Sequence, residues 1–328
     1  MEWNRVYVSD ALEGVSRLPG QSVQSCVTSP PYFRQRDYGV AGQWGQENSP
    51  EQYVEHLVLL FREVRRILVD MGTVWVVLGD SYASKSRGGR IEKRHGMAIY
   101  GPPVGLYDGI KRKDLLGIPW MVAFALRADG WYLRQDIIWS KVNPMPESMR
   151  DRCTRSHEYI FMLSKSPKYF YNHLGIATPL SKSALKRMNQ RLENQQRSNR
   201  AWGKKNGPMK AAFTAFKQNG HGRRHDGFNA RWEDSVVKVA NRKSVWPIAT
   251  AMSKEDHFAS FPGEIPSLCI KAATREGDIV LDPFAGTGTT LLQASRLGRR
   301  YMGFDLNAKY VGIAQRRLRE LEGLFYRG

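Results

Sequence analysis

The sequence predicts an α/β fold in which a doubly wound, mostly parallel sheet carries an inserted basic region. Three observations support this. Strand and helix patterns alternate along most of the 328 residues, which is typical of parallel sheets covered on both faces. A glycine-rich turn joins a strand to a helix near the carboxyl end of the chain. A formal net charge of +19 is concentrated in two segments rather than spread evenly.

The first half of the chain begins with a β-rich run over residues 22–32 that ends in a turn. Residues 49–68 follow as an amphipathic helix, because Ser49 suits the N-cap, Pro50 suits the first helical position and apolar residues recur at helical spacing. Residues 72–82 predict a buried strand. We further expect a helix over residues 118–130 and strands over residues 131–141 and 157–167.

The second half resumes the alternation after residue 244. Residues 261–274 predict a helix, and residues 278–299 predict a strand, a glycine-rich turn and a helix. Residues 300–307 form a strand pattern with an acid near its end. A terminal helix is expected over residues 308–321.

Positive charge separates two segments from the rest of the chain. Residues 181–243 hold 16 Lys and Arg against 4 Asp and Glu, and residues 85–113 hold 8 against 2. A charge run is often only a solvated face, and it can also be an arm that orders on binding. Aromatic side chains interleave the longer run, which favours a surface that contacts nucleic-acid phosphates and bases.

Other sequence features bear on the setting of the protein. No apolar run reaches the roughly 18 residues of a membrane span, and the first residues lack a signal-peptide pattern. The three cysteines are far apart and form no CxxC pair, which argues against a disulfide framework or a structural zinc site. We therefore expect a cytoplasmic protein that has no metal and does not act at a membrane.

The glycine-rich turn spans residues 282–288, follows the run Ile279–Leu281 and opens a helix. Glycines there let the backbone approach a ligand closely, and the helix N-terminus offers free N–H groups. Asp305 comes 17 residues after Gly288, at the end of the next strand, where nucleoside-binding folds place an acid for the ribose hydroxyls. The alternative is a plain tight β–α turn.

The ligand expected at this turn is not a phosphate-rich nucleotide. No Lys-Ser or Lys-Thr pair follows the turn as a P-loop requires, and Leu291 interrupts the G-x-G-x-x-G spacing. Asp282 would repel a pyrophosphate. It would suit a cationic cofactor such as S-adenosylmethionine, which carries a sulfonium and an amino group.

A second turn, Thr28–Tyr32, follows the predicted strand in the first half. Ser29 and Pro30 each precede a proline and are pushed to extended conformations, and both prolines lack an N–H. The turn therefore presents a hydroxyl, bare carbonyls and an aromatic face, as gripping an –NH2 group requires. A plain Pro-Pro loop is the alternative. Both turns follow strands, so we expect them to face one crevice at the carboxyl edge of the sheet.

At these two motifs the chain resembles the amino-group DNA methyltransferases that depend on S-adenosylmethionine. Thr28–Tyr32 is similar to their catalytic Asp/Asn/Ser-Pro-Pro-Tyr motif, and Asp282–Gly288 to their Phe-x-Gly-x-Gly cofactor motif. The catalytic motif comes first here, which looks like the circularly permuted β-class arrangement. The resemblance covers about residues 1–180 and 244–321, and it implies a Rossmann-like methyltransferase fold.

The resemblance divides the chain into three parts. Residues 1–180 would form the catalytic half, residues 181–243 the DNA target-recognition region and residues 244–328 the cofactor-binding half. Two further segments look like family segments. Asn143–Glu158 is similar to one beside the target base, and Phe258–Pro262 to one that precedes the glycine turn.

The resemblance also implies roles for single residues. Ser29 Oγ and the Pro30 carbonyl would accept the amine hydrogens of a flipped base, Tyr32 would stack on that base, and Pro31 would fix the turn. Asp305 would hold the cofactor's ribose. The other cofactor-binding candidates are Asp10, Phe261, Pro262, Asp282, Phe284, Ala285, Gly286 and Gly288, and the candidates for DNA contact are Arg150, Arg152 and Arg155.

Several alternatives stay open. Ser29 favours cytosine N4 as the methyl acceptor, with adenine N6 as the alternative, because adenine enzymes usually carry Asp or Asn at that position. A second hypothesis is methylation of RNA or of a protein side-chain amide. A third is a DNA-binding protein without catalytic activity. Asp10 either contacts the cofactor or caps the following helix, and His157 is expected to be structural.

The expected partners are duplex DNA, a second copy of the chain and a cognate restriction endonuclease. The expected source is a prokaryote or a phage, with the protein associated with the nucleoid through DNA binding.

Overall fold

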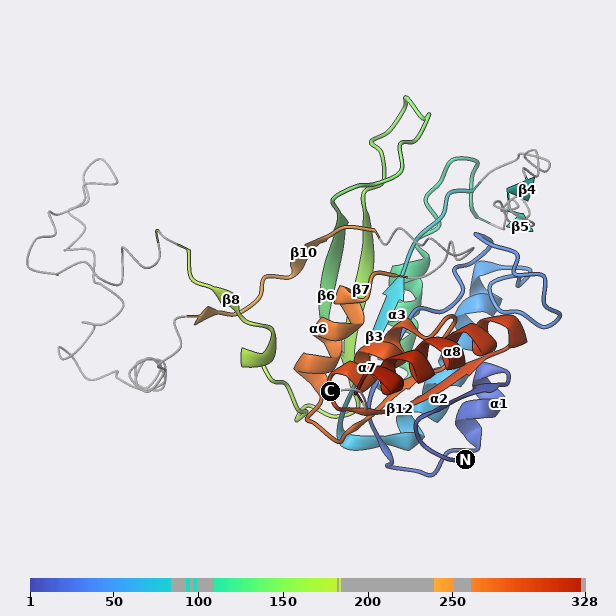
Figure 1. Cartoon of the computed structure of the whole chain (residues 1–328). Coiled ribbons are helices and arrows are strands. Elements are labelled where there is room, and N and C mark those ends of the chain that lie inside the picture. Colours follow the sequence, from blue (N-terminus) through green and yellow to red (C-terminus); the bar gives the residue numbers. More distant parts are fainter. Residues whose placement is uncertain are drawn as a thin grey trace, which may run out of the picture. The chain divides into compact units, whose positions relative to one another are not determined.

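The computed structural model describes residues 1–83, 93–94, 97–98, 109–181, 183, 239–250 and 261–325 (Figure 1). The chain forms two compact units, residues 1–175 with 243–328, and residues 176–242. Most of the expected recognition region and of the first basic segment lies outside the described residues, as does Phe258. In the smaller unit, β8 (Thr178–Pro179) pairs antiparallel with β9 (Val239–Ala240).

An eight-stranded sheet forms the centre of the larger unit, in the order β1-β12-β11-β2-β3-β7-β6-β10. Neighbouring strands are parallel except at β7, which runs antiparallel to both β3 and β6. The predicted doubly wound, mostly parallel sheet is therefore confirmed. The strands are β1 (Arg5–Val8), β2 (Val23–Thr28), β3 (Leu68–Leu78), β6 (Tyr132–Lys141), β7 (His157–Ser164), β10 (Val245–Ile248), β11 (Ile279–Asp282) and β12 (Arg300–Asp305).

Helices cover both faces of this sheet (Figure 1). On one face α2 packs against both α1 and α3, and on the other α7 packs against both α6 and α8. The buried apolar side chains of the first group join those of the sheet in one continuous core. The helices are α1 (Ala11–Ser16), α2 (Pro50–Ile67), α3 (Ile118–Ala128), α6 (Glu264–Ala273), α7 (Thr289–Arg296) and α8 (Ala308–Phe325).

The start of α2 shows how closely local sequence sets an element. Ser49 is its N-cap, with Oγ accepting from Gln52 N at 3.3 Å, and Pro50 is the first helical residue, as predicted. The helix passes directly into β3, which begins at Leu68, four residues before the predicted start. The four-residue strands β1 and β10, at the two edges of the sheet, are not among the strands predicted from the sequence.

Two small features complete the fold. The short strands β4 (Lys93–Arg94) and β5 (Met97–Ala98) pair antiparallel with each other. Among the residues that the structure describes, no helix is both long enough and apolar enough to cross a membrane.

Candidate active site

The two predicted motifs meet where β2 and β11 lie side by side. Thr28 ends β2, Asp282 ends β11, and the Thr28 hydroxyl donates to Asp282 Oδ1 at 2.7 Å. From this pair of strands the chain winds outward in opposite directions, through β3 on one side and β12 on the other. Such switch points are where ligands bind in doubly wound sheets. The expected common crevice is present.

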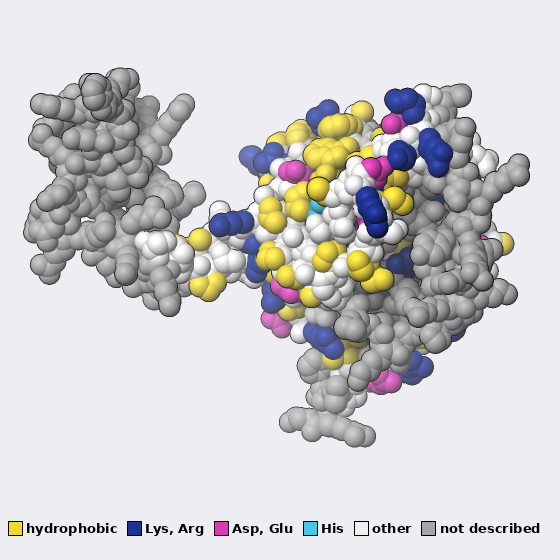
Figure 2. Space-filling view, turned by 90° about the horizontal axis from the view of Figure 1, so that it is seen from above, with side chains coloured by type: hydrophobic (Ala, Val, Ile, Leu, Met, Phe, Trp, Pro, Cys, Tyr) yellow, Lys and Arg dark blue, Asp and Glu magenta, His cyan; other side chains and the backbone are white. Residues whose placement is uncertain are grey.

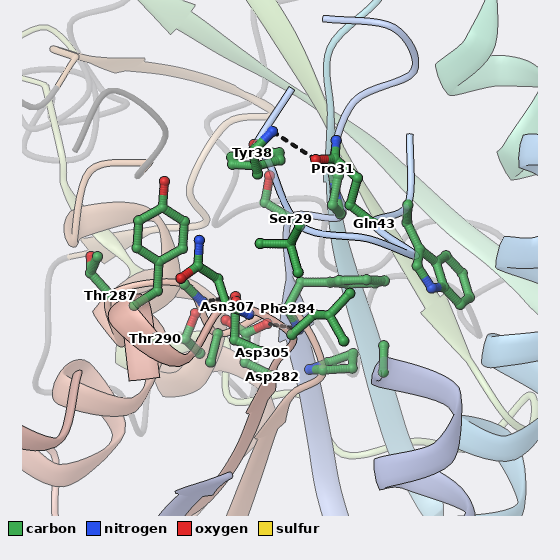
Figure 3. Close-up of a pocket in the computed structure, with 18 of the residues that line it drawn as sticks. Ser29, Pro31, Tyr38, Gln43, Asp282, Phe284, Thr287, Thr290, Asp305 and Asn307 are labelled. Atoms are coloured by element: carbon green, nitrogen blue, oxygen red, sulfur yellow. Dashed lines mark hydrogen bonds between the residues drawn. The ribbon is translucent and has the colours of Figure 1, made fainter. Parts of the chain in front are cut away.

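A cavity opens at this point, and residues of both motifs line it (Figure 3). Of the predicted catalytic and cofactor-binding residues, Pro30, Tyr32, Pro262 and Gly288 lie outside the lining. The lining residues are Asp10, Ala11, Ser29, Pro31, Tyr38, Val40, Gln43, Trp44, Phe261, Asp282, Pro283, Phe284, Ala285, Gly286, Thr287, Thr289, Thr290, Asp305, Leu306, Asn307 and Tyr310.

One buried and one partly buried carboxylate supply the negative charge of this cavity. Asp282 is 1% exposed, and burial raises its pKa to about 6 against the hydrogen bonds from Thr28 Oγ1 and Phe284 N. Burial also raises the pKa of Asp305, whose oxygens accept from Asn307 N and Gly286 N at 2.8 Å each. Two partly desolvated acids therefore face one space, and a cationic ligand would favour their ionised forms.

Asp10 has the geometry for both roles that the sequence left open. Its Oδ1 accepts from Leu12 N at 2.9 Å and from Glu13 N at 3.1 Å, so it caps α1. Its Oδ2 accepts from Trp44 Nε1 at 2.8 Å, and the residue lines the cavity. One carboxylate thus fixes a helix start and an aromatic wall.

The two glycines of the cofactor motif do different work. Gly286 lines the cavity in the left-handed region, at φ 52°, with its N–H directed to Asp305. Gly288, at φ 81°, is the N-cap of α7 and packs against α8. A Cβ atom there would lie 2.9 Å from Ala314 Cβ. Gly288 is expected to contact the ligand, but in the structure it allows α7 and α8 to approach each other closely.

The Ser-Pro-Pro-Tyr turn is held from several sides. Tyr53 of α2 donates to the Pro31 carbonyl at 2.9 Å, and Pro30 is buried. Ser29 lines the cavity, whereas the Tyr32 hydroxyl donates to Glu158 Oε2 at 2.6 Å. The turn therefore presents Ser29 to the cavity and anchors Tyr32 to the strand β7.

A third wall of the cavity comes from residues 33–48, for which the sequence predicts no element or site residue. Trp44 packs edge-on to Phe284 at 5.4 Å between ring centroids. Gln43 Oε1 accepts from Tyr38 N at 2.7 Å (Figure 3). Gly45, at φ 86°, lies against the Ser-Pro-Pro-Tyr turn, because a Cβ there would lie 3.0 Å from the Tyr32 carbonyl oxygen. The clustering of glycines and aromatic residues in this segment, between β2 and α2, is the sequence signal that could have indicated a binding loop.

The three predicted DNA-contacting arginines differ in their surroundings. Arg150 is exposed, and the described residues give its side chain no hydrogen bond or ion pair. Arg152 pairs with Glu147 and lies 4.1 Å over the Tyr82 ring, and Arg155 donates to the Asp80 carbonyl.

Arg152 and Arg155 line a second cavity together with His157 and Glu158. Seen from above, the described surface shows Lys and Arg side chains among exposed apolar ones (Figure 2). The His157 ring packs edge-on against Tyr159, with centroids 5.4 Å apart.

Comparisons with known proteins agree with this arrangement. The family model N6_N4_Mtase, described as DNA methylase, matches residues 23–316. The chain is 40% identical to the Type II methyltransferase M.Cfr9I of Citrobacter freundii, over 95% of this chain and 87% of that protein. It is also 40% identical to the Type II methyltransferase M.SmaI of Serratia marcescens, over 96% and 90%.

Two solved structures share the fold. The PvuII DNA methyltransferase, described as cytosine-N4-specific, superposes with a TM-score of 0.60 at 16% identity, covering 98% of this chain and 91% of that one. A putative DNA modification methylase of Thermus thermophilus in complex with S-adenosyl-L-methionine superposes with a TM-score of 0.56 at 23% identity, covering 97% and 94%.

Proposed function

The chain belongs to the N6_N4_Mtase family of DNA methylases, and from this premise we propose that it methylates the exocyclic N4 amine of cytosine in duplex DNA. The methyl donor is S-adenosylmethionine. The observation that carries the proposal is the meeting of Ser29 with the cofactor turn in one cavity, fastened by the hydrogen bond between Thr28 and Asp282.

The residues of the cavity fit this cofactor. Its acids, Asp282 and Asp305, suit a ligand with a cationic centre and ribose hydroxyls, and Trp44 and Phe284 offer aromatic walls for a nucleobase. Ala285 and Gly286 would border the methionine portion. When bound, S-adenosylmethionine supplies a methyl group on a positively charged sulfur, which makes that carbon electrophilic.

Ser29 and Pro30 perform the central task on the acceptor side. Ser29 Oγ and the Pro30 carbonyl accept the two hydrogens of the amine, which draws the nitrogen lone pair out of conjugation with the ring. The lone pair is then directed toward the methyl carbon. Tyr32 provides the stacking surface for the base. Positioning and fixed dipoles thus supply the acceleration.

A base inside a duplex cannot reach this cavity, so we infer that it is flipped out of the helix at a cost of a few kcal/mol. Arg150, exposed in the β6–β7 hairpin, is the strongest candidate for a phosphate contact. Arg152 and Arg155 line the second cavity, and in this proposal they contact DNA only at the edge of that cavity.

The choice of base rests on Ser29, since the serine form of the motif is most like the cytosine-N4 branch. The cytosine-N4 description of the PvuII methyltransferase supports the same choice. The motif order supports the β-class arrangement, with residues 181–243 as the recognition region. The names of the closely similar relatives support a restriction-modification role and a cognate endonuclease. A second copy of the chain is the remaining candidate partner, and light scattering tests it.

Mass spectrometry of nucleosides tests the proposed reaction. Unmethylated bacterial DNA is incubated with the protein and S-adenosylmethionine, hydrolysed and analysed. N4-methylcytosine is the expected product. If N6-methyladenine were the only product, the target base would be adenine and not cytosine. Methyl transfer to RNA but not to duplex DNA would mean that the substrate is RNA. Absence of cofactor binding by calorimetry would favour an inert DNA-binding protein.

A further inference from the structure

A continuous row of polar groups leads away from Ser29 into the protein. Ser29 Oγ lies 3.4 Å from Tyr32 Oη, which donates to Glu158 Oε2 at 2.6 Å. Lys141 Nζ donates to the other oxygen, Oε1, at 2.5 Å. Lys141 ends β6 and Glu158 lies near the start of β7, so one hairpin supplies both charges.

This row of polar groups contributes little to the stability of the fold. The side chains of Lys141 and Glu158 are only 23% and 10% exposed, and a buried ion pair adds little net stability after its desolvation. Gly79, after β3, also lacks a side chain where the Tyr32 ring lies, because a Cβ there would be 2.6 Å from Tyr32 Cε2. A purely structural hairpin could use apolar residues at these positions.

The direction of the hydrogen bonds follows from the charge. An ionised Glu158 can only accept, so Tyr32 must donate its one hydroxyl hydrogen to it. The Tyr32 oxygen is then an acceptor for the Ser29 hydroxyl. With its hydrogen committed to Tyr32, Ser29 can offer only lone pairs to the cavity. An incoming amine, which brings hydrogens, meets the acceptor that it needs.

We propose that Glu158, held by Lys141, is a positioning residue that fixes Ser29 as an acceptor and takes up the proton that the amine loses. This inference rests on the proposed function. As the nitrogen–methyl bond forms and the methyl–sulfur bond breaks, the nitrogen is left with one proton too many. That proton passes to Ser29 Oγ, the hydroxyl proton of Ser29 passes to Tyr32 Oη, and the phenol proton passes to Glu158 Oε2. The carboxyl group ends neutral.

The direct test is Glu158→Gln, which keeps the size of the side chain and a carbonyl oxygen but cannot take up a proton. We expect the single-turnover rate of methyl transfer to unmethylated bacterial DNA to fall at least tenfold. The KM for that DNA and the Kd for S-adenosylmethionine should change less than twofold. A loss of cofactor affinity equal to the loss of rate would overturn the proposal, as would an unchanged rate.

Lys141 offers a rescue and the other end of β7 offers a matched control. Lys141→Met should reduce the rate like Glu158→Gln, whereas Lys141→Arg, which keeps the charge, should restore most of it. Lys165 pairs with Asp70 at 3.3 Å beyond the far end of the hairpin, and Lys165→Met should leave the rate unchanged. Equal effects of Lys141→Met and Lys165→Met would mean that the pair is only structural.

A second readout needs neither DNA nor cofactor. Burial raises the pKa of the Tyr32 phenol well above its ordinary value, and the negative charge of Glu158 raises it further. Glu158→Gln should therefore lower this pKa, as measured by ultraviolet absorbance of the phenolate with Tyr32→Phe variants as blanks. An unchanged Tyr32 titration contradicts the relay. A wild-type protein that transfers no methyl group to DNA contradicts the proposed function instead.

Discussion

Around the glycine-rich turn the polar groups that interact come from nearby stretches of chain, whereas around the Ser-Pro-Pro-Tyr turn they come from strands far apart in sequence. Gly286 and Asp305 are separated by 19 residues. Tyr32 and Glu158 are separated by 126, and Thr28 and Asp282 by 254. The glycine turn and its acids thus belong to one strand–turn–helix–strand unit, to which Asp10 and Trp44 are added from the N-terminal part of the chain. The Ser-Pro-Pro-Tyr turn depends on the assembled sheet.

Substitutions on the two sides should therefore have different effects. A change in the local unit should affect cofactor affinity and leave the other side intact. A change at the catalytic turn should affect the rate of methyl transfer and leave cofactor affinity intact. A variant on one side that changed both cofactor affinity and the rate of methyl transfer would show that the two sides are coupled. That coupling would be stronger than the single hydrogen bond from Thr28 to Asp282 implies.

Ser29→Ala should give the largest effect, a loss on the order of 10²-fold in kcat, because a preorganised polar partner of the reacting group is removed. The Kd for S-adenosylmethionine should stay within twofold in calorimetry, since the cofactor's acids are untouched. Ser16→Ala, at an exposed site in α1, is the control. A parallel loss of cofactor affinity would break the division.

Gly79→Ala should reduce kcat at least tenfold through Tyr32, whose ring occupies the space of the new methyl group. Overpacking of this kind costs about 1–3 kcal/mol of stability, so Tm should fall as well. In α8, Gly312→Ala meets nothing within 4 Å and should raise Tm slightly at unchanged kcat. Full activity of Gly79→Ala would mean that the position of the Tyr32 ring is unimportant.

Asp305→Asn should weaken the affinity for S-adenosylmethionine about ten- to a hundredfold, in line with the loss of a charged hydrogen-bond partner worth about 1.5–3 kcal/mol. Affinity for duplex DNA, measured by fluorescence anisotropy, should not change. Asp278→Asn, one residue before the same strand unit and capping Arg275 N, is the matched control. Unchanged cofactor affinity in Asp305→Asn would remove the ribose role.

Cofactor binding should weaken as the pH falls through about 6, the pKa to which burial raises Asp282. The ionised carboxylate, present above that pH, attracts a cationic ligand, so each lower unit should cost up to about tenfold in affinity. For the free protein the sign is opposite. The neutral Asp282 carboxyl is the form that the folded protein tolerates best. Its contribution to folding stability is fully present below the ordinary pKa of 3.8 and is lost as the pH rises through about 6.

Calorimetry across this pH range measures the effect on cofactor affinity. Asp282→Asn should flatten the profile, and a profile that keeps its slope in that variant would assign the titration to another group.

Arg150→Ala should have the smallest effect, a reduction of about one in the slope of log affinity for DNA against log salt. Methyl transfer at saturating DNA should be unaffected. A change in kcat at saturation would place Arg150 on the catalytic side of the division.

The same contrast explains what the sequence could reveal. Asp282, Gly286 and Asp305 lie in one periodic unit whose spacing already implies their proximity. Trp44 and Glu158 contact the site only after distant strands and a loop have assembled. Opposite charges at facing ends of the hairpin, Lys141 and Glu158, were a visible signal. Their link to Tyr32 was not, because it depends on the order of β2, β3 and β7 in the sheet.

Asp10 illustrates a further limit. Helix capping and cofactor contact are alternatives at the level of sequence, but a carboxylate has two oxygens. In the structure one oxygen accepts from the start of α1 and the other from Trp44. Gly288 shows the reverse case, in which a motif position expected at the ligand serves helix packing. Both depend on side-chain geometry that spacing alone does not determine.

The position of β2 has a consequence for synthesis on the ribosome. One of its neighbours, β3, follows within the next 50 residues, but the other, β11, begins only at Ile279. The N-terminal strand β1 waits longer still for β12. Emerging chains therefore carry two unsatisfied strand edges for most of their translation, a state prone to wrong pairing. Nascent chains stopped before residue 279 should remain protease-sensitive, and resistance should appear only when the last two strands have emerged.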